Sequence, residues 1–129
     1  MSDRACGKLV MIVDDDRDVR ESIAEVLEDN DYRALGASNG QEAFDRLRGQ
    51  SIKPCVILLD MMMPVMDGWQ FRALQCDDPE LGHIPVIVLT AHADVDHPTN
   101  GVAFAESLRK PVQIDKLLDT IERHCRGSS

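Results

Sequence analysis

The chain has 129 residues, of which 43% are hydrophobic and 29% charged, a composition typical of one soluble globular domain. Its formal net charge of −9 argues against binding to nucleic acid or to an anionic membrane, both of which favour a basic surface. No apolar run is long enough to span a membrane or to form the core of a signal peptide, so we expect a cytoplasmic protein.

The cysteines are widely spaced and form no CxxC pair: Cys6, Cys55, Cys76 and Cys125. The histidines also lack the spacing of metal ligands on a helix. We therefore expect reduced thiols, as is usual in cytosolic proteins.

The first predicted element is Leu9–Val13, a continuous apolar run that ends in Asp14, Asp15 and Asp16. An apolar run of this length predicts a strand that is buried on both faces. The next segment predicts an amphipathic helix that ends at Asn30. Its expected inward residues are Val19, Ile23, Val26 and Leu27.

Tyr32–Ala37 is a weaker strand pattern, typical of the edge of a sheet. Ser38 and Gln41 have the spacing of a capping box, in which the first residue caps a helix and the second lies three positions later. We expect a short helix there, closed by Gly49. Its predicted inward residues are Ala43, Phe44 and Leu47.

Cys55–Leu59 is a second apolar run, and it leads directly into Asp60. This stretch alone leaves two interpretations open, because Asp60 could cap the next helix or belong to a functional site. A turn at Asp67–Gly68 then precedes a predicted helix. That helix carries Trp69, Phe71, Ala73 and Leu74.

A third apolar run, Pro85–Leu89, ends in Thr90. Pro98 and Gly101 interrupt the helical pattern of residues 92–106, so we expect an irregular or mobile fourth helix there. A brief last strand over Ser107–Arg109 leads to Lys110 and Pro111. The closing helix has the expected inner face Ile114, Leu117, Leu118, Ile121 and Cys125.

Strands that alternate with helices predict an α/β fold, a parallel sheet with helices on both faces. Because all strands of such a sheet end at one edge, where ligands bind, six polar residues should meet there. They are Asp14, Asp15, Asp16, Asp60, Thr90 and Lys110. This convergence decides against a capping role alone for Asp60, whereas Asp16 is expected to cap a helix.

Carboxylates gathered at one edge repel each other and favour a bound divalent cation, and oxygen ligands suit Mg²⁺. A carboxylate beside Mg²⁺ can act as a nucleophile toward phosphorus. Thr90 and Lys110 could bind the remaining phosphoryl oxygens. The pattern therefore predicts phosphoryl transfer onto an aspartate.

Four blocks of the chain resemble the signature blocks of the response regulator receiver domain of two-component signalling. They are Ile12–Asp16, Leu58–Gly68, Val88–Ala91 and Leu108–Pro111. The resemblance implies a flavodoxin-like, doubly wound, five-stranded parallel sheet of order 2-1-3-4-5. It also implies one receiver domain over residues 1–129, with a structured core at about 8–125 and no output domain in this chain.

By this resemblance, Asp60 matches the phosphoacceptor, which receives a phosphoryl group from a histidine kinase or a histidine phosphotransfer protein. Asp15 matches the direct Mg²⁺ ligand, and Asp14 acts mostly through water. The carboxylate of Asp60 and the backbone carbonyl of Met62 would complete the protein's share of the metal shell.

Thr90 matches the switch hydroxyl, and Lys110 matches the amine that pairs with a phosphoryl oxygen, followed by a typically cis bond to Pro111. Ser107 stands where the family usually has an aromatic switch residue. We therefore expect output through another face, or through ordering of residues 92–106 on phosphorylation.

Met62 and His92 occupy the positions that tune hydrolysis in the family, and neither positions water well. We therefore expect slow autodephosphorylation, in an acceptor rather than a turnover enzyme, with an unidentified downstream protein as partner.

Alternatives are the receiver part of a hybrid kinase or multidomain regulator and, in another class, a Mg²⁺-dependent phosphatase that forms aspartyl-phosphate. Phosphatases of the haloacid-dehalogenase type use a DxDx(T/V) pattern, which the residues from Asp14 to Asp18 do not match. A flavin-binding module is excluded because the aspartates after the first strand would repel its phosphate.

Overall fold

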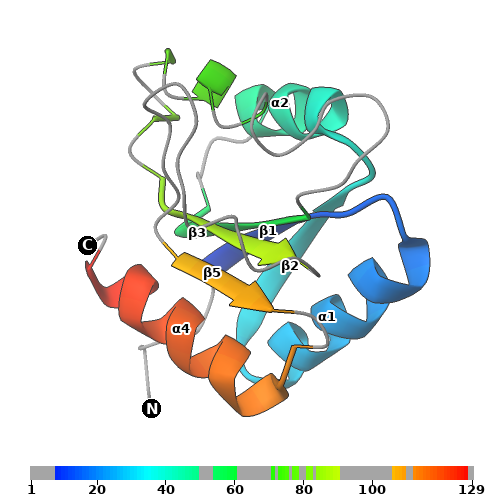
Figure 1. The fold of residues 1–129 in the computed structure, drawn as a ribbon, viewed down its shortest axis with the longest axis vertical. Helices are drawn as coiled ribbons and strands as arrows, with labels where there is room; N and C mark the ends of the chain where they lie inside the picture. The colour runs from blue at the N-terminus through cyan, green and yellow to red at the C-terminus, as the bar shows by residue number, and fades with distance from the viewer. Residues whose placement is uncertain are drawn as a thin grey trace.

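The computed structural model describes residues 8–49, 54–60, 71, 73–75, 77–78, 81–82, 84–90, 106–109 and 112–127. Its centre is a five-stranded sheet of order β2-β1-β3-β4-β5, in which every neighbouring pair is parallel (Figure 1). The strands are β1 Lys8–Val13, β2 Tyr32–Ala37, β3 Val56–Asp60, β4 Val86–Thr90 and β5 Glu106–Arg109. This order is the one that the sequence resemblance implies.

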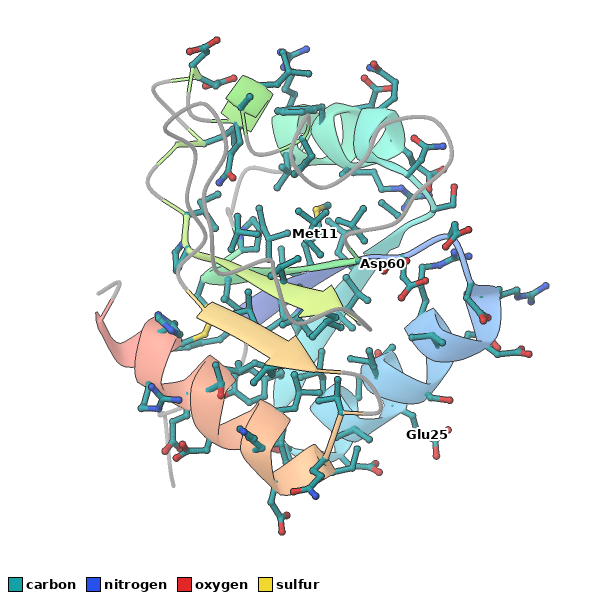
Figure 2. The ribbon with its side chains drawn as sticks, viewed as in Figure 1. Met11, Glu25 and Asp60 are labelled. Carbon is teal, nitrogen blue, oxygen red and sulfur yellow. A yellow bond between two sulfur atoms is a disulfide. The ribbon has the colours of Figure 1, made fainter. Side chains whose placement is uncertain are left out.

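Helices cover both faces of the sheet. Helices α1 (Arg17–Asp29) and α4 (Ile114–Gly127) pack on one face, and α2 (Gly40–Gly49) packs on the other (Figure 1). Alternate residues of β1 belong to the two layers: Val10 and Ile12 pack with residues of α1 and α4, whereas Met11 and Val13 pack with residues of α2. Figure 2 shows Met11 between the sheet and α2. A strand buried on both faces has no polar face, which is why its sequence is continuously apolar.

The predicted inward faces are largely correct. In α2, Ala43, Phe44 and Leu47 are buried, and the ring of Phe44 lies 4.8 Å from that of Phe71. Ile114 is an exception: it is 46% exposed, because it is the first residue of α4 and lies ahead of the turn that reaches the core.

The predicted cap of α2 is wrong by one residue. The side chain of Asn39, not Ser38, accepts a hydrogen bond from the backbone N–H of Glu42, with an oxygen-nitrogen distance of 2.8 Å. Glu42 takes the place predicted for Gln41, and its Oε1 accepts a hydrogen bond from the backbone N–H of Ser38 at 2.6 Å. Asn39 is also a preferred N-cap residue, and a carboxylate in the first turn is favoured by the helix dipole, which supports this register.

The expectation of reduced thiols is wrong for Cys55 and Cys125, which form a disulfide across a sequence separation of 70 residues. Cys55 precedes β3, and Cys125 lies in the last turns of α4. The two cysteines are far apart in the sequence, so the tertiary fold is what brings them together. Cys6 and Cys76 lie outside the described residues.

We expect Glu42→Gln to lower the free energy of unfolding by about 0.5–1 kcal/mol at neutral pH, because it weakens the α2 cap. The hydrogen bond from the Ser38 backbone, aided by the Ser38 hydroxyl and by Arg46, holds the pKa of Glu42 below its ordinary value. The charged form therefore stabilises the fold above the ordinary glutamate pKa of about 4.3, and this contribution is lost as the pH falls through the lower folded-state pKa.

Urea unfolding over a range of pH tests this expectation, and the stabilities of the two proteins should converge in acid. Glu25→Gln is the matched control, because Glu25 points from α1 into solvent (Figure 2). A stability difference that persisted unchanged in acid would contradict the role given to the carboxylate.

Candidate metal centre

Asp60 is the last residue of β3, and the side chain is only 6% exposed. Its backbone is paired with Leu89 of β4, so its position is fixed by the sheet rather than by a loop. Figure 2 shows Asp60 at the edge of the sheet, beside the chain that leaves β1 for α1. The apolar strand thus delivers one carboxylate to the carboxyl edge of the sheet.

Asp14 follows β1 and is 1% exposed. Its backbone N–H donates to the carbonyl oxygen of Ala37 at 3.0 Å, which extends the contact between β1 and β2 by one residue. Its carbonyl oxygen accepts a hydrogen bond from Nη1 of Arg20 at 2.7 Å, and its Oδ1 accepts one from the backbone N–H of Asp16 at 2.9 Å. The backbone and the carboxylate of Asp14 are therefore both held in place.

Asp16 is the N-cap of α1, as predicted. Its Oδ1 accepts hydrogen bonds from the backbone N–H groups of Asp18, at 2.9 Å, and Val19, at 3.4 Å. The cap starts the helix immediately after the strand, and Asp15 is left exposed between them.

The carboxylates of Asp14, Asp15 and Asp60 each offer an oxygen atom, and these atoms all lie within 4.8 Å of one another. At that separation two negative charges repel by roughly 3 kcal/mol at an effective dielectric constant of about 20. A divalent cation would replace this repulsion with attraction, and an all-carboxylate set suits a hard cation such as Mg²⁺. The cluster therefore fits the predicted metal.

The other predicted site residues are only partly described. Thr90 is the last residue of β4, one position beyond the residue paired with Asp60, so its backbone lies at the same edge of the sheet. Lys110 directly follows β5, but Lys110 and Met62 themselves lie outside the described residues, as do Pro111, His92 and the segment 92–105.

Arg20 is a feature of the site that the sequence did not reveal. Its guanidinium reaches back along α1 to the carbonyl of Asp14, and its side chain passes 3.6 Å from where a Cβ of Gly36 would lie. The sequence did contain a signal, a basic residue in the first turn of the helix that follows the aspartates. Such residues are usually expected to point into solvent.

An apolar cavity of about 600 Å³ opens between α1 and the start of α4. It explains why Val19 and Val26, predicted as inward residues, are only half-buried. It reaches Leu89, the residue paired with Asp60. The lining residues are Asp18, Val19, Ser22, Ile23, Val26, Leu89, Val112 and Ile114.

Residues 10–122 match the family model of the response regulator receiver domain. The chain belongs to this family. The match covers the acidic cluster and all five strands of the sheet except the first two residues of β1.

Named relatives agree with the family. The chain is 32% identical over 120 residues to the polar-differentiation response regulator DivK of Brucella anthropi, covering 91% of this chain and 95% of DivK. It is 38% identical over 112 residues to the response regulator MprA of Mycolicibacterium vanbaalenii, covering 84% of this chain but only 46% of MprA. The chain thus spans almost all of one relative and about half of the other.

Solved structures show the same fold. The signal receiver domain of a signal transduction histidine kinase from Syntrophus aciditrophicus has a TM-score of 0.83 at 28% identity, covering 94% of this chain and 92% of that chain. The chemotaxis protein CheY4 of Vibrio cholerae has a TM-score of 0.83 at 27% identity, covering 92% of this chain and 98% of that chain. Within the part of this receiver domain that the structure describes, no helix is long and apolar enough to cross a membrane.

We expect Asp15→Asn to weaken Mg²⁺ binding by about tenfold or more, because it removes a charged oxygen ligand from the cluster. Isothermal titration calorimetry of the folded domain measures this. Asp29→Asn, an equal change of charge at the exposed end of α1, is the control and should bind Mg²⁺ as wild type does. Equal affinity in Asp15→Asn and wild type would contradict the assignment.

Proposed function

We propose that Asp60 accepts a phosphoryl group from a phosphohistidine on a histidine kinase or a histidine phosphotransfer protein, as receiver domains of this family do. Asp14, Asp15, Asp60 and the backbone carbonyl of Met62 would hold a Mg²⁺ ion. The observation that supports this most directly is the meeting of three carboxylates within 4.8 Å at the carboxyl edge of β1 and β3.

The transfer is a substitution at phosphorus. A carboxylate oxygen of Asp60 bonds to the phosphorus atom while the phosphorus–nitrogen bond of the donor breaks, and the departing imidazole keeps the electron pair of that bond. Bound Mg²⁺ would supply positive charge to the phosphoryl oxygens and let two anions approach. Asp14 and Asp15 would hold the metal, and burial of Asp60 would limit access of water to the acyl phosphate.

In this proposal the hydroxyl of Thr90 and the amine of Lys110 bind the remaining phosphoryl oxygens. Their positions in the chain support it, because each stands at the carboxyl end of a strand on the same side of β3. Phosphorylation then switches a protein-binding surface. With Ser107 in the usual aromatic position, the output uses another face or the ordering of residues 92–106.

We further propose that the cavity between α1 and α4 receives the donor. It is apolar, it is bordered by Asp18, and it reaches the strand next to Asp60. A donor helix with an apolar stripe and basic neighbours matches this surface and the net charge of −9.

The domain acts as an acceptor with slow autodephosphorylation rather than as a turnover enzyme, in the cytoplasm, with an unidentified downstream protein and neither nucleic acid nor membrane as its direct partner. The partial coverage of MprA supports a second version, in which the same site serves as the receiver part of a multidomain regulator or hybrid kinase.

We expect intact mass spectrometry to show one added phosphoryl group on the wild-type protein after incubation with acetyl phosphate and Mg²⁺, and none on Asp60→Asn. Asp29→Asn is the control and should be labelled like wild type. The label should be removed by hydroxylamine, since an acyl phosphate is formed. Equal labelling of Asp60→Asn would exclude Asp60 as the acceptor, and turnover of generic phosphoesters would favour the phosphatase alternative.

A further inference from the structure

The disulfide lies at the end of the sheet opposite the acidic cluster. Cys55 precedes β3 at its amino end, whereas Asp60 ends the same strand. The backbone N–H of Cys55 donates to the carbonyl oxygen of Leu9 at 2.8 Å, so this cysteine is held by the sheet. The bond thus has no part in the metal centre, and it joins the rigid sheet to a helix.

The two cysteines differ in their exposure to solvent. Cys125 is 3% exposed and belongs to the apolar core beneath α4, together with Leu117 and Ile121. Cys55 is only partly buried. Thiol–disulfide exchange requires a thiolate to reach one sulfur of the bond, so access selects Cys55 as the atom attacked.

Contacts besides the bond also hold the end of α4. The amine of Lys8 donates to the carbonyl oxygen of Cys125 at 3.3 Å, and Ile121 is the buried anchor one turn earlier. Leu117 is buried a further turn back. Because Leu117 and Ile121 anchor the earlier turns, opening the bond would loosen the last turn of α4 first and leave the rest of the helix docked.

We propose that Cys55–Cys125 is a thiol-exchange site, which a dithiol reductant opens in the folded protein by attack on Cys55. A thiolate of the reductant bonds to Sγ of Cys55, the bond between the cysteines breaks, and the Cys125 thiolate leaves and takes up a proton. The second thiolate of the reductant then attacks the reductant's other sulfur atom, which is bonded to Cys55 in the mixed disulfide. This step releases Cys55 as a thiol and oxidises the reductant to its cyclic disulfide. The cyclic disulfide reverses both steps when the two cysteine thiols attack it in turn.

In the cytoplasm, the location proposed above, small thiols keep most cysteines reduced, and the protein disulfides that do form there are usually transient and redox-sensing. A purely structural bond would open only when the whole protein unfolds. The two possibilities are distinguished by whether exchange occurs in the native state and by which sulfur carries the adduct.

The test treats the full-length wild-type protein with glutathione under native conditions and maps the mixed disulfide by peptide mass spectrometry. Circular dichroism confirms that the protein stays folded. We expect the adduct on Cys55. An adduct on Cys125, or exchange only at denaturant concentrations that unfold the protein, would overturn the proposal.

Two single variants form a matched pair. Each variant leaves one cysteine of the pair free to react with iodoacetamide. Cys55 in the Cys125→Ala variant should react at least about tenfold faster than Cys125 in the Cys55→Ala variant, because Cys55 is the more accessible of the two. Equal reaction rates would overturn the asymmetry. Should either variant fail to fold, the adduct map on wild type still decides the question.

Hydrogen exchange measures the consequence for the helix. Reduction of the wild-type protein by dithiothreitol should increase the exchange of backbone amides in the last turns of α4, while those of β1 and β3 stay protected. Unchanged exchange in α4, or a loss of protection throughout the sheet, would contradict the proposed local release.

Discussion

Three carboxylates held within 4.8 Å of one another are the constraint on which the proposed function of this domain depends. Asp14 and Asp60 are almost completely buried, and Asp15 is exposed beside them. Such a cluster opposes folding unless a cation is bound, because burial weakens the solvation that would screen the charges. The apolar strands that precede these residues offset that cost and fix the carboxylates in place.

The two edges of the parallel sheet carry different groups. Its carboxyl edge gathers the acidic cluster, the end of β4 and the apolar cavity beside α1. Its amino edge carries the covalent link between Cys55 and Cys125. Helix α4 extends between the two regions, since Ile114 borders the cavity and Cys125 forms the disulfide. Opening of the disulfide would therefore act on a helix that also borders the proposed donor site.

Much of this arrangement could be predicted from the sequence, because its signals are local or follow from parallel topology. The apolar runs that end in Asp14 and Asp60 predict buried strands, and parallel strands bring those ends to one edge. The capping role of Asp16 is likewise a local property. The family resemblance added the strand order, which periodicity alone does not supply.

The failures have physical reasons. The disulfide joins residues 70 positions apart, and no local pattern reports such a meeting. The cap of α2 lies one residue later than predicted because Asn39 accepts the N–H of Glu42, and the Glu42 carboxylate in turn accepts the N–H of Ser38. Ile114 fits the apolar periodicity of α4 but lies before the first turn that packs on the core. The contact of Arg20 with Asp14 depends on how α1 lies against β1, which no local pattern indicates.

The most direct measurement of the central claim is urea unfolding of wild type and Asp60→Asn, each in a chelator and in Mg²⁺. In the chelator we expect Asp60→Asn to be the more stable protein by roughly 1–3 kcal/mol, because one of three repelling charges is gone. Mg²⁺ at about a hundred times its Kd should stabilise wild type by about 2.7 kcal/mol and stabilise the variant by less. A wild-type protein equally stable in chelator and in Mg²⁺, and no less stable than Asp60→Asn without the metal, would contradict the claim that these carboxylates form a cation site.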